Sequence, residues 1–186
     1  MRSDVFIQGL IDQTQDILHQ VSNLKQMELS ALVWKPQPEA WHILECLEHL
    51  NLYGAYYLPE IERKIHGSTQ RPAPTFKSGI LGRYFAKSIL PKEHLNIMKA
   101  PADKNPIGSQ LDKSTIGTFL DQQEKLLALL HQSKEVSLHK IKVKTALSSL
   151  INLKLGDTFQ FYINHIIRHL AQIERVREAL KGAGLD

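Results

Sequence analysis

Four stretches of the chain repeat their apolar residues every three or four positions, which is the spacing of a helix that buries one face. These stretches lie at residues 6–24, about 41–66, about 112–133 and about 158–180. Two long connections, 67–111 and 134–156, separate the last three stretches, and the chain contains no convincing run of paired strands. The pattern predicts an all-α fold, a four-helix bundle, and the long connections favour crossovers over a simple up-and-down topology.

Residues at the ends of these stretches match the usual start and stop signals of helices. Ser3 is available as an N-cap for the first helix, and Gly67 follows the second. Asp157, with Gln160 three residues later, resembles a capping box, which would begin the fourth helix near residue 158. Pro59 lies inside the second stretch, and we expect a kink there because proline lacks an amide hydrogen and crowds the preceding turn.

The two connections are longer than most loops of a compact domain, which indicates a functional lid, a crossover or a wall of a site. Residues 67–111 contain five prolines, so no long helix can cross them, although 79–90 can form a short one. We expect 67–111 to wall the site opening or a dimer contact, and the whole chain, 1–186, to form a single domain. In the second connection, the lysines of 139–144 alternate as in a solvated edge strand or loop.

Composition argues against several classes of partner. The net charge is only +4 and the basic residues are dispersed, so we expect no nucleic-acid partner. The longest aliphatic run, 126–130, is far shorter than a membrane span, so we expect no membrane partner. The single cysteine, Cys46, cannot form an internal disulfide, and the N-terminal residues lack an apolar signal core. A cytoplasmic location is the simplest expectation.

His165 and His169 are the histidines most suggestive of chemistry. They stand four residues apart on the fourth predicted helix, on the face that also carries Phe161 and Ile173. One helical turn brings two imidazoles close enough to bind one ion. Without an ion, a buried ring nitrogen that lacks a partner costs about 1–3 kcal/mol. The alternative is that both rings form hydrogen bonds within the bundle or reach its solvent end.

A metal site needs a third ligand from another helix, and His49 is the natural candidate. It lies beside the apolar residues Leu47 and Leu50 of the second stretch. The alternative is a histidine at the edge of the core that is bonded to a backbone carbonyl. Cys46 could also ligate a metal, but a lone cysteine is more often a small buried hydrophobic residue.

Two segments resemble the DinB-like, damage-inducible family of helical-bundle proteins. Residues 41–50, Trp-His-Ile-Leu-Glu-Cys-Leu-Glu-His-Leu, are similar to the family segment Trp-Ser-x-x-(Glu/Gln)-x-(Leu/Ile)-x-His-(Leu/Ile). Residues 155–173 are similar to the closing helix of the family, which carries His-x-x-x-His-x-x-Gln-(Ile/Leu). One departure is His42, which stands where the family commonly has a serine that caps the helix. We expect His42 to weaken that cap and to be exposed.

The resemblance implies a four-helix bundle with crossovers that holds one divalent metal ion on three histidines. The metal in the family is zinc, nickel or iron, and the matching residues of this chain are His49, His165 and His169. Activities known or proposed in the family are thiol-dependent transfer, isomerisation and metal-dependent hydrolysis. The resemblance therefore implies a homodimer that acts on a small-molecule substrate, with a low-molecular-weight thiol as cosubstrate of the transfer reactions.

Three protein nitrogens leave coordination positions open, as in catalytic zinc sites, so our first hypothesis is a metal-dependent hydrolase or thiol-dependent transferase. Glu45, one turn before His49, could act as a base or orient a ligand; the alternative is a solvated glutamate. Tyr53, one turn after His49, could donate to a developing negative charge or simply line the core. Gln172 could orient His169 or a substrate; the alternative is an interface residue. The alternative function is a non-catalytic metal-binding or interaction bundle of the stress response.

Overall fold

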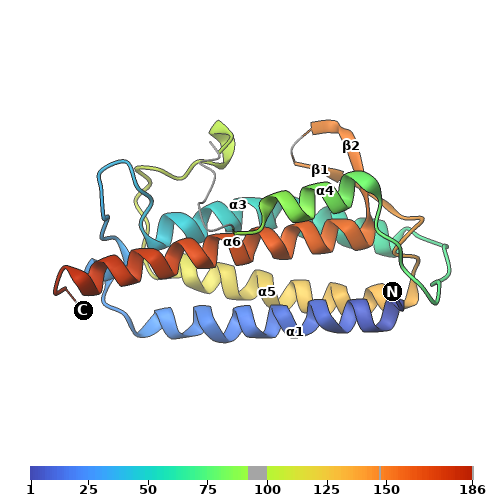
Figure 1. Ribbon diagram of the computed structural model, residues 1–186, viewed down its shortest axis with the longest axis horizontal. Coiled ribbons are helices and arrows are strands. Elements are labelled where there is room, and N and C mark those ends of the chain that lie inside the picture. Colours follow the sequence, from blue (N-terminus) through green and yellow to red (C-terminus); the bar gives the residue numbers. More distant parts are fainter. Residues whose placement is uncertain (92–99, 147, 186) are drawn as a thin grey trace.

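The computed structural model describes residues 1–91, 100–146 and 148–185. Four long helices form a bundle, as the apolar periodicity predicts (Figure 1). Helices α1 and α3 each pack against both α5 and α6, so the four helices surround one core. The bundle helices are α1 (Ser3–Ser22), α3 (Ile43–His66), α5 (Ser114–Gln132) and α6 (Leu155–Gly182).

The order of the helices requires the crossover that the long connections predict. Helices α3 and α5 run in the same direction, because the segment between them travels back along the bundle before α5 begins (Figure 1). Within this segment the expected short helix is confirmed as α4 (Ile80–Ile89), which packs along α6. The smaller helical elements are α2 (Leu29–Leu32) and the 3-10 turns Asn23–Gln26, Ala102–Lys104 and Ser133–Glu135.

A two-stranded antiparallel hairpin leads into α6 and corrects the expectation of a chain without paired strands. Its strands are β1 (Lys142–Thr145) and β2 (Ser148–Lys154). The alternating lysines do mark β1, which buries Val143 between exposed neighbours. Strand β2 gives no such pattern in the sequence, because leucines occupy both of its faces: Leu150 is 90% exposed and Leu153 is buried. The hairpin places its buried face against α3 and α6.

Two expected N-caps are wrong, because both side chains form contacts between distant segments. The hydroxyl of Ser3 donates to the carbonyl of Ala73 at 2.7 Å. Helix α6 begins two residues before Asp157, so Asp157 is not its cap. The Asp157 carboxylate accepts from the hydroxyl of Ser78 and, at 2.9 Å, from the amide of Gly79. These two bonds attach the start of α4 to the start of α6.

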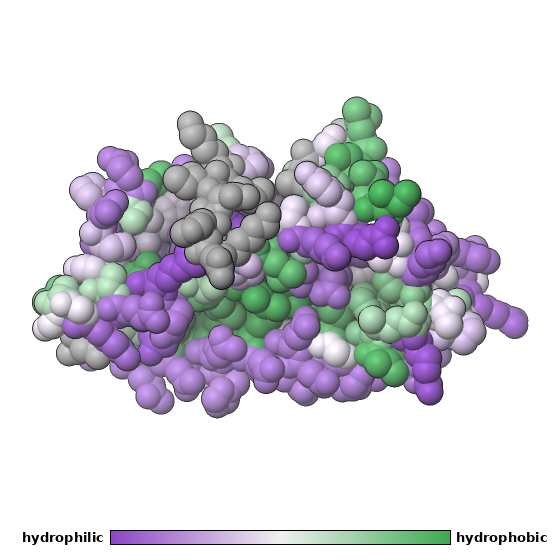
Figure 2. All heavy atoms as spheres, in the orientation of Figure 1, coloured by the Kyte–Doolittle hydropathy of each residue, from purple (hydrophilic) through white to green (hydrophobic). Residues whose placement is uncertain are grey.

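Apolar side chains fill the bundle and polar ones cover its outer faces, as expected for amphipathic helices. The largest fully buried side chains include Tyr57, Phe119 and Tyr162. Figure 2 shows hydrophilic side chains along the lower edge of the molecule, where α1 lies. Helix α3 continues through Pro59 without a break, and the kink predicted there stays a prediction. No helix among the described residues is long and apolar enough to cross a membrane.

Candidate metal centre

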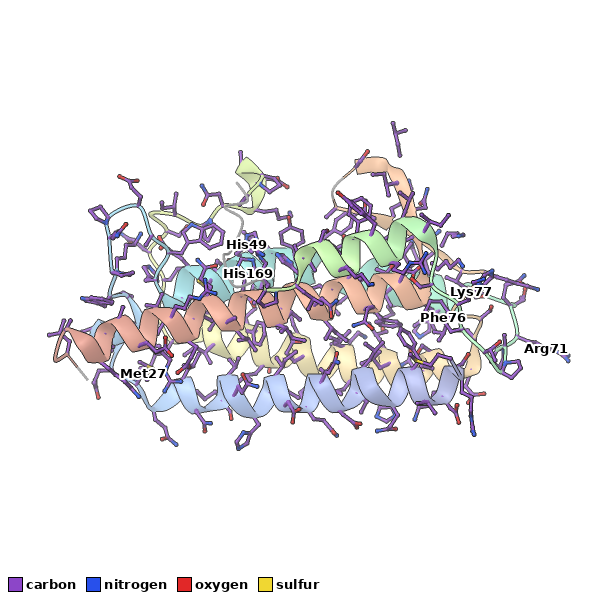
Figure 3. All side chains as sticks on the ribbon, viewed as in Figure 1. Met27, His49, Arg71, Phe76, Lys77 and His169 are labelled. Carbon is purple, nitrogen blue, oxygen red and sulfur yellow. The ribbon has the colours of Figure 1, made fainter. Side chains whose placement is uncertain are left out.

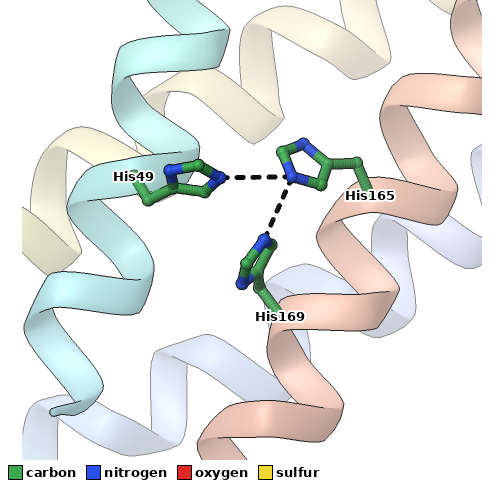
Figure 4. A group of neighbouring side chains, drawn as sticks. All are labelled: His49, His165 and His169. Atoms are coloured by element: carbon green, nitrogen blue, oxygen red, sulfur yellow. Dashed lines mark hydrogen bonds between the residues drawn. The ribbon is translucent and has the colours of Figure 1, made fainter. Parts of the chain in front are cut away.

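Three histidines from two helices meet inside the bundle. His49 extends from α3 and His169 from α6 (Figure 3). His165 lies one turn before His169 on α6. All three are buried, with exposed fractions of 3%, 5% and 7%. The Nε2 atom of His165 lies 3.3 Å from Nε2 of His49 and 3.0 Å from Nε2 of His169 (Figure 4). The structure therefore brings together the residues that the sequence suggests as metal ligands, in a group that could hold one ion.

In two of these histidines, the hydrogen bond made by Nδ1 determines that Nε2 carries the lone pair. His49 Nδ1 lies 2.6 Å from the carbonyl oxygen of Lys104, and His169 Nδ1 lies 3.0 Å from Oε1 of Gln172. An amide or carbonyl oxygen only accepts hydrogen bonds, so each Nδ1 carries the hydrogen. In a neutral imidazole the other nitrogen then has a free lone pair. The Nε2 lone pairs of His49 and His169 consequently both face His165.

Without a cation, the buried ring nitrogens of the three histidines cannot all have hydrogen-bond partners. His165 Nε2 can supply at most one hydrogen to the two lone pairs that face it. Its Nδ1 is buried and has no hydrogen-bond partner among the described residues. Either tautomer of His165 thus leaves a buried nitrogen unsatisfied. A metal ion would accept all three lone pairs, and ligands of one tetrahedral zinc lie about 3.3 Å apart because each Zn–N bond is about 2.0–2.1 Å. The three residues fit such an ion.

Burial keeps the three imidazoles in the neutral form that can ligate a metal. It lowers the pKa of His169 to about 3, assisted by the neighbouring His49. Burial also holds the pKa of His49 below its usual value, and the pKa of His165 well below it. All three rings are therefore uncharged at neutral pH, which is the state that metal coordination requires.

Aromatic rings surround the histidines. The Trp41 ring lies 4.8 Å from that of His49 and 5.9 Å from that of His169, measured between centroids. The Tyr53 ring lies 4.9 Å from His49 and 4.7 Å from His165. Burial raises the pKa of Tyr53, so its hydroxyl stays protonated and able to donate. Sequence reasoning missed Trp41 as a site residue, although it stands eight positions before His49 in the same family segment.

Glu45 is not the solvated glutamate that the sequence suggests as an alternative. It is fully buried, and Lys35 forms an ion pair with it at 2.9 Å. The Glu45 carboxylate also accepts from the amides of Gly108 at 2.9 Å and His42 at 3.1 Å. Burial opposes its ionisation, but these bonds outweigh that effect and hold the pKa of Glu45 below its usual value. The carboxylate is therefore ionised and bound to three different segments of the chain.

His42 corrects two expectations. It is 5% exposed rather than solvated, and it caps α3 rather than weakening the cap. Its Nδ1 accepts from the amide of Glu45 at 3.1 Å, while the Glu45 carboxylate accepts from the His42 amide, which completes a capping box. The Nδ1 lone pair of the His42 imidazole thus accepts the hydrogen bond that a serine hydroxyl accepts in the usual N-cap.

The neighbouring cysteine and glutamine follow the expectations. Cys46 is fully buried, and burial raises the pKa of its thiol, as expected for a small hydrophobic residue. Gln172 does orient His169, through the bond described above. Sequence reasoning gave no signal for the Lys104 carbonyl, because a backbone group has no residue-specific signature.

A helical bundle in which two helices bring three buried histidines together defines a class of candidate metal-binding proteins. Within that class, the chain belongs to the DinB superfamily, whose family model matches residues 10–173. The match includes all of α3 and α5, most of α1 and α6, and all three histidines, and it confirms the resemblance found in the sequence. No curated protein and no solved structure matches the chain significantly.

Proposed function

We propose that this protein is a metal-dependent enzyme that binds one divalent ion, zinc, nickel or iron, through His49, His165 and His169. The observation that carries the proposal is the direction of the lone pairs: the Nδ1 contacts of His49 and His169 turn both Nε2 atoms toward His165. A purely structural role would be served better by rings that satisfy one another. Three nitrogen ligands also leave positions open for water or substrate.

The proposed reaction is hydrolysis of a small molecule or transfer of a low-molecular-weight thiol onto one. When bound, a divalent ion lowers the pKa of a coordinated water or thiol and so supplies a nucleophile at neutral pH. The Tyr53 phenol, protonated and beside two of the histidines, donates a hydrogen bond to negative charge that develops on the substrate. The Trp41 ring covers His49 and His169 and restricts water there. The role of Glu45 as a general base stays a prediction.

The metal assignment is tested by elemental analysis after dialysis. His169→Ala should remove most of the bound metal, because two nitrogens hold an ion far less tightly than three. His131→Ala is the matched control: this histidine is exposed on α5, and its loss should leave the metal content unchanged. Equal metal content in both variants would remove the site assignment.

The two candidate reactions are separated by two assays on metal-loaded protein. One follows hydrolysis of p-nitrophenyl esters, and the other follows conjugation of a chlorobimane with small thiols. His169→Ala should abolish whichever activity is found. If metal-loaded wild type accelerates neither reaction beyond the His169→Ala variant, the non-catalytic metal-binding or interaction bundle of the stress response becomes the better proposal.

We also propose that the enzyme is a cytoplasmic homodimer without nucleic-acid partners. These proposals rest on the family resemblance and on the dispersed charge of the chain. Sedimentation velocity at high micromolar concentration should show a dimer of about twice the 21.2 kDa chain mass. A single monomeric species at that concentration would contradict it.

A further inference from the structure

A short segment that follows α4 in the chain is attached to the first two turns of α3 at two points. We call residues 104–108 the strap. The carbonyl of Lys104 meets Nδ1 of His49 at 2.6 Å, and the amide of Gly108 donates to Oε1 of Glu45 at 2.9 Å. Glu45 and His49 are four positions apart on α3, and Lys104 and Gly108 are four positions apart on the strap. One turn of α3 therefore determines where both ends of the strap lie.

The Glu45 carboxylate is the fixed point of this contact. Its side chain is 1% exposed, and Lys35 lies 3.0 Å from one oxygen and 2.9 Å from the other. The second oxygen also accepts from the amide of His42. A buried carboxylate is held in one position when an opposite charge and several donors surround it. Gly108 is consequently docked on a rigid acceptor.

We propose that Glu45 is a positioning residue for the metal site, which acts on His49 through the strap. By docking Gly108, Glu45 places the Lys104 carbonyl on Nδ1 of His49, and that carbonyl keeps the hydrogen on Nδ1 and the lone pair on Nε2. The proposal deepens the function proposed above and rests on it for its effect on metal binding. Its effect on the His49 tautomer is independent of any metal.

Loss of the Glu45 contact should release the strap and free His49 to exchange its hydrogen between the two ring nitrogens. The metal would then bind a ring that must first be rearranged. Partners that orient metal-binding histidines are worth about 10–100-fold in metal affinity. We therefore expect Glu45→Ala to weaken zinc binding by about that factor, although Glu45 is not a ligand.

The matched variants lie in the same helix and in the strap. Glu45→Gln keeps an oxygen that accepts from Gly108 and should retain the wild-type tautomer and most of the affinity. Glu48→Ala is the control, because Glu48 lies one turn away and bonds only Asn51 among the described residues. Gly108→Ala perturbs the strap from its other end: Gly108 has φ +79°, which strains an alanine, while open space surrounds its Cβ position. It should shift the tautomer in the same direction as Glu45→Ala.

The experiment measures ring-nitrogen NMR shifts of metal-free protein labelled with ¹⁵N-histidine, with His49→Ala used for assignment. Wild type, Glu45→Gln and Glu48→Ala should show His49 protonated at Nδ1, and Glu45→Ala and Gly108→Ala a mixture of tautomers. Zinc affinity is then measured by chelator competition. An unchanged His49 tautomer in both Glu45→Ala and Gly108→Ala overturns the inference, and so does a changed tautomer with unchanged zinc affinity. If wild type itself binds no metal, the function proposed above fails, while the tautomer result still decides whether Glu45 positions His49.

Discussion

Replacement of the central histidine by leucine should leave the stability of the metal-free protein nearly unchanged while it destroys the metal site. His165 is buried between the other two histidines, and its Nδ1 has no hydrogen-bond partner among the described residues. Its Nε2 faces two lone pairs that it cannot both satisfy. A leucine of similar size removes both nitrogens of His165 and keeps the space filled, but it also removes the one hydrogen that Nε2 can supply to His49 or His169.

The expected balance follows from the groups that are removed. Loss of the unpartnered Nδ1 gains about 1–3 kcal/mol, whereas loss of the Nε2 hydrogen leaves one more lone pair unpaired and costs about as much. The ring contacts with Tyr53 at 4.7 Å and His169 at 4.7 Å, each worth about 0.5–1.5 kcal/mol, are also lost. The apolar contacts of the leucine offset part of that loss. We expect a net change of at most about 1 kcal/mol, or roughly 2–4 °C in the unfolding midpoint of a domain of this size.

Thermal unfolding followed by circular dichroism after dialysis against a chelator measures this change. His165→Leu should unfold within about 4 °C of metal-free wild type, and added zinc should raise the midpoint of wild type only. Zinc at about 100 times its Kd adds about 2.7 kcal/mol to wild type. His131→Leu, on the exposed face of α5, controls for the substitution itself. The reasoning is wrong if His165→Leu unfolds more than about 4 °C below metal-free wild type, because the histidine would then be stabilising without an ion.

Two further predictions concern the fold. Gly54→Ala should lower stability by about 1–3 kcal/mol, because its Cβ would meet the Gln122 amide and lie 2.8 Å from the Tyr162 hydroxyl. Gly117→Ala, with nothing within 4 Å of the added Cβ, should raise stability by about 0.5–1 kcal/mol. A urea midpoint that rises for Gly54→Ala or falls for Gly117→Ala would contradict the corresponding prediction. Burial lowers the pKa of His42, so its contribution to stability is complete above its ordinary pKa of 6.5 and declines as the pH falls. His42→Ser should therefore flatten the fall of the unfolding midpoint between pH 7 and pH 5, and an unchanged slope would show that the capping imidazole does not titrate there.

The sequence predicts the bundle well because a helix that buries one face has a recognisable pattern of apolar residues. Apolar residues recur at helical spacing wherever a face is buried, so the four long helices were located to within two or three residues at each end. Of the hairpin, the sequence predicts only β1. Strand β2 carries leucines on both faces, with Leu150 outward and Leu153 inward, so its sequence lacks the alternation of apolar and polar residues. Caps were predicted least well: Ser3 and Asp157 have the right side chains for a cap but bond to residues about 70 to 79 positions away.

In the metal centre, sequence spacing predicts which residues are the ligands, whereas tertiary contacts determine how their rings are oriented. His165 and His169 share a face by their spacing alone, and His49 follows from a second apolar stripe. The groups that orient them do not follow from spacing. Lys35 approaches Glu45 from ten residues away, and the strap approaches α3 through a backbone carbonyl and a backbone amide, which any residue except proline can supply. A ligand set can therefore be predicted from side-chain identity, whereas the tautomer that makes His49 a ligand depends on a contact that only the folded chain contains.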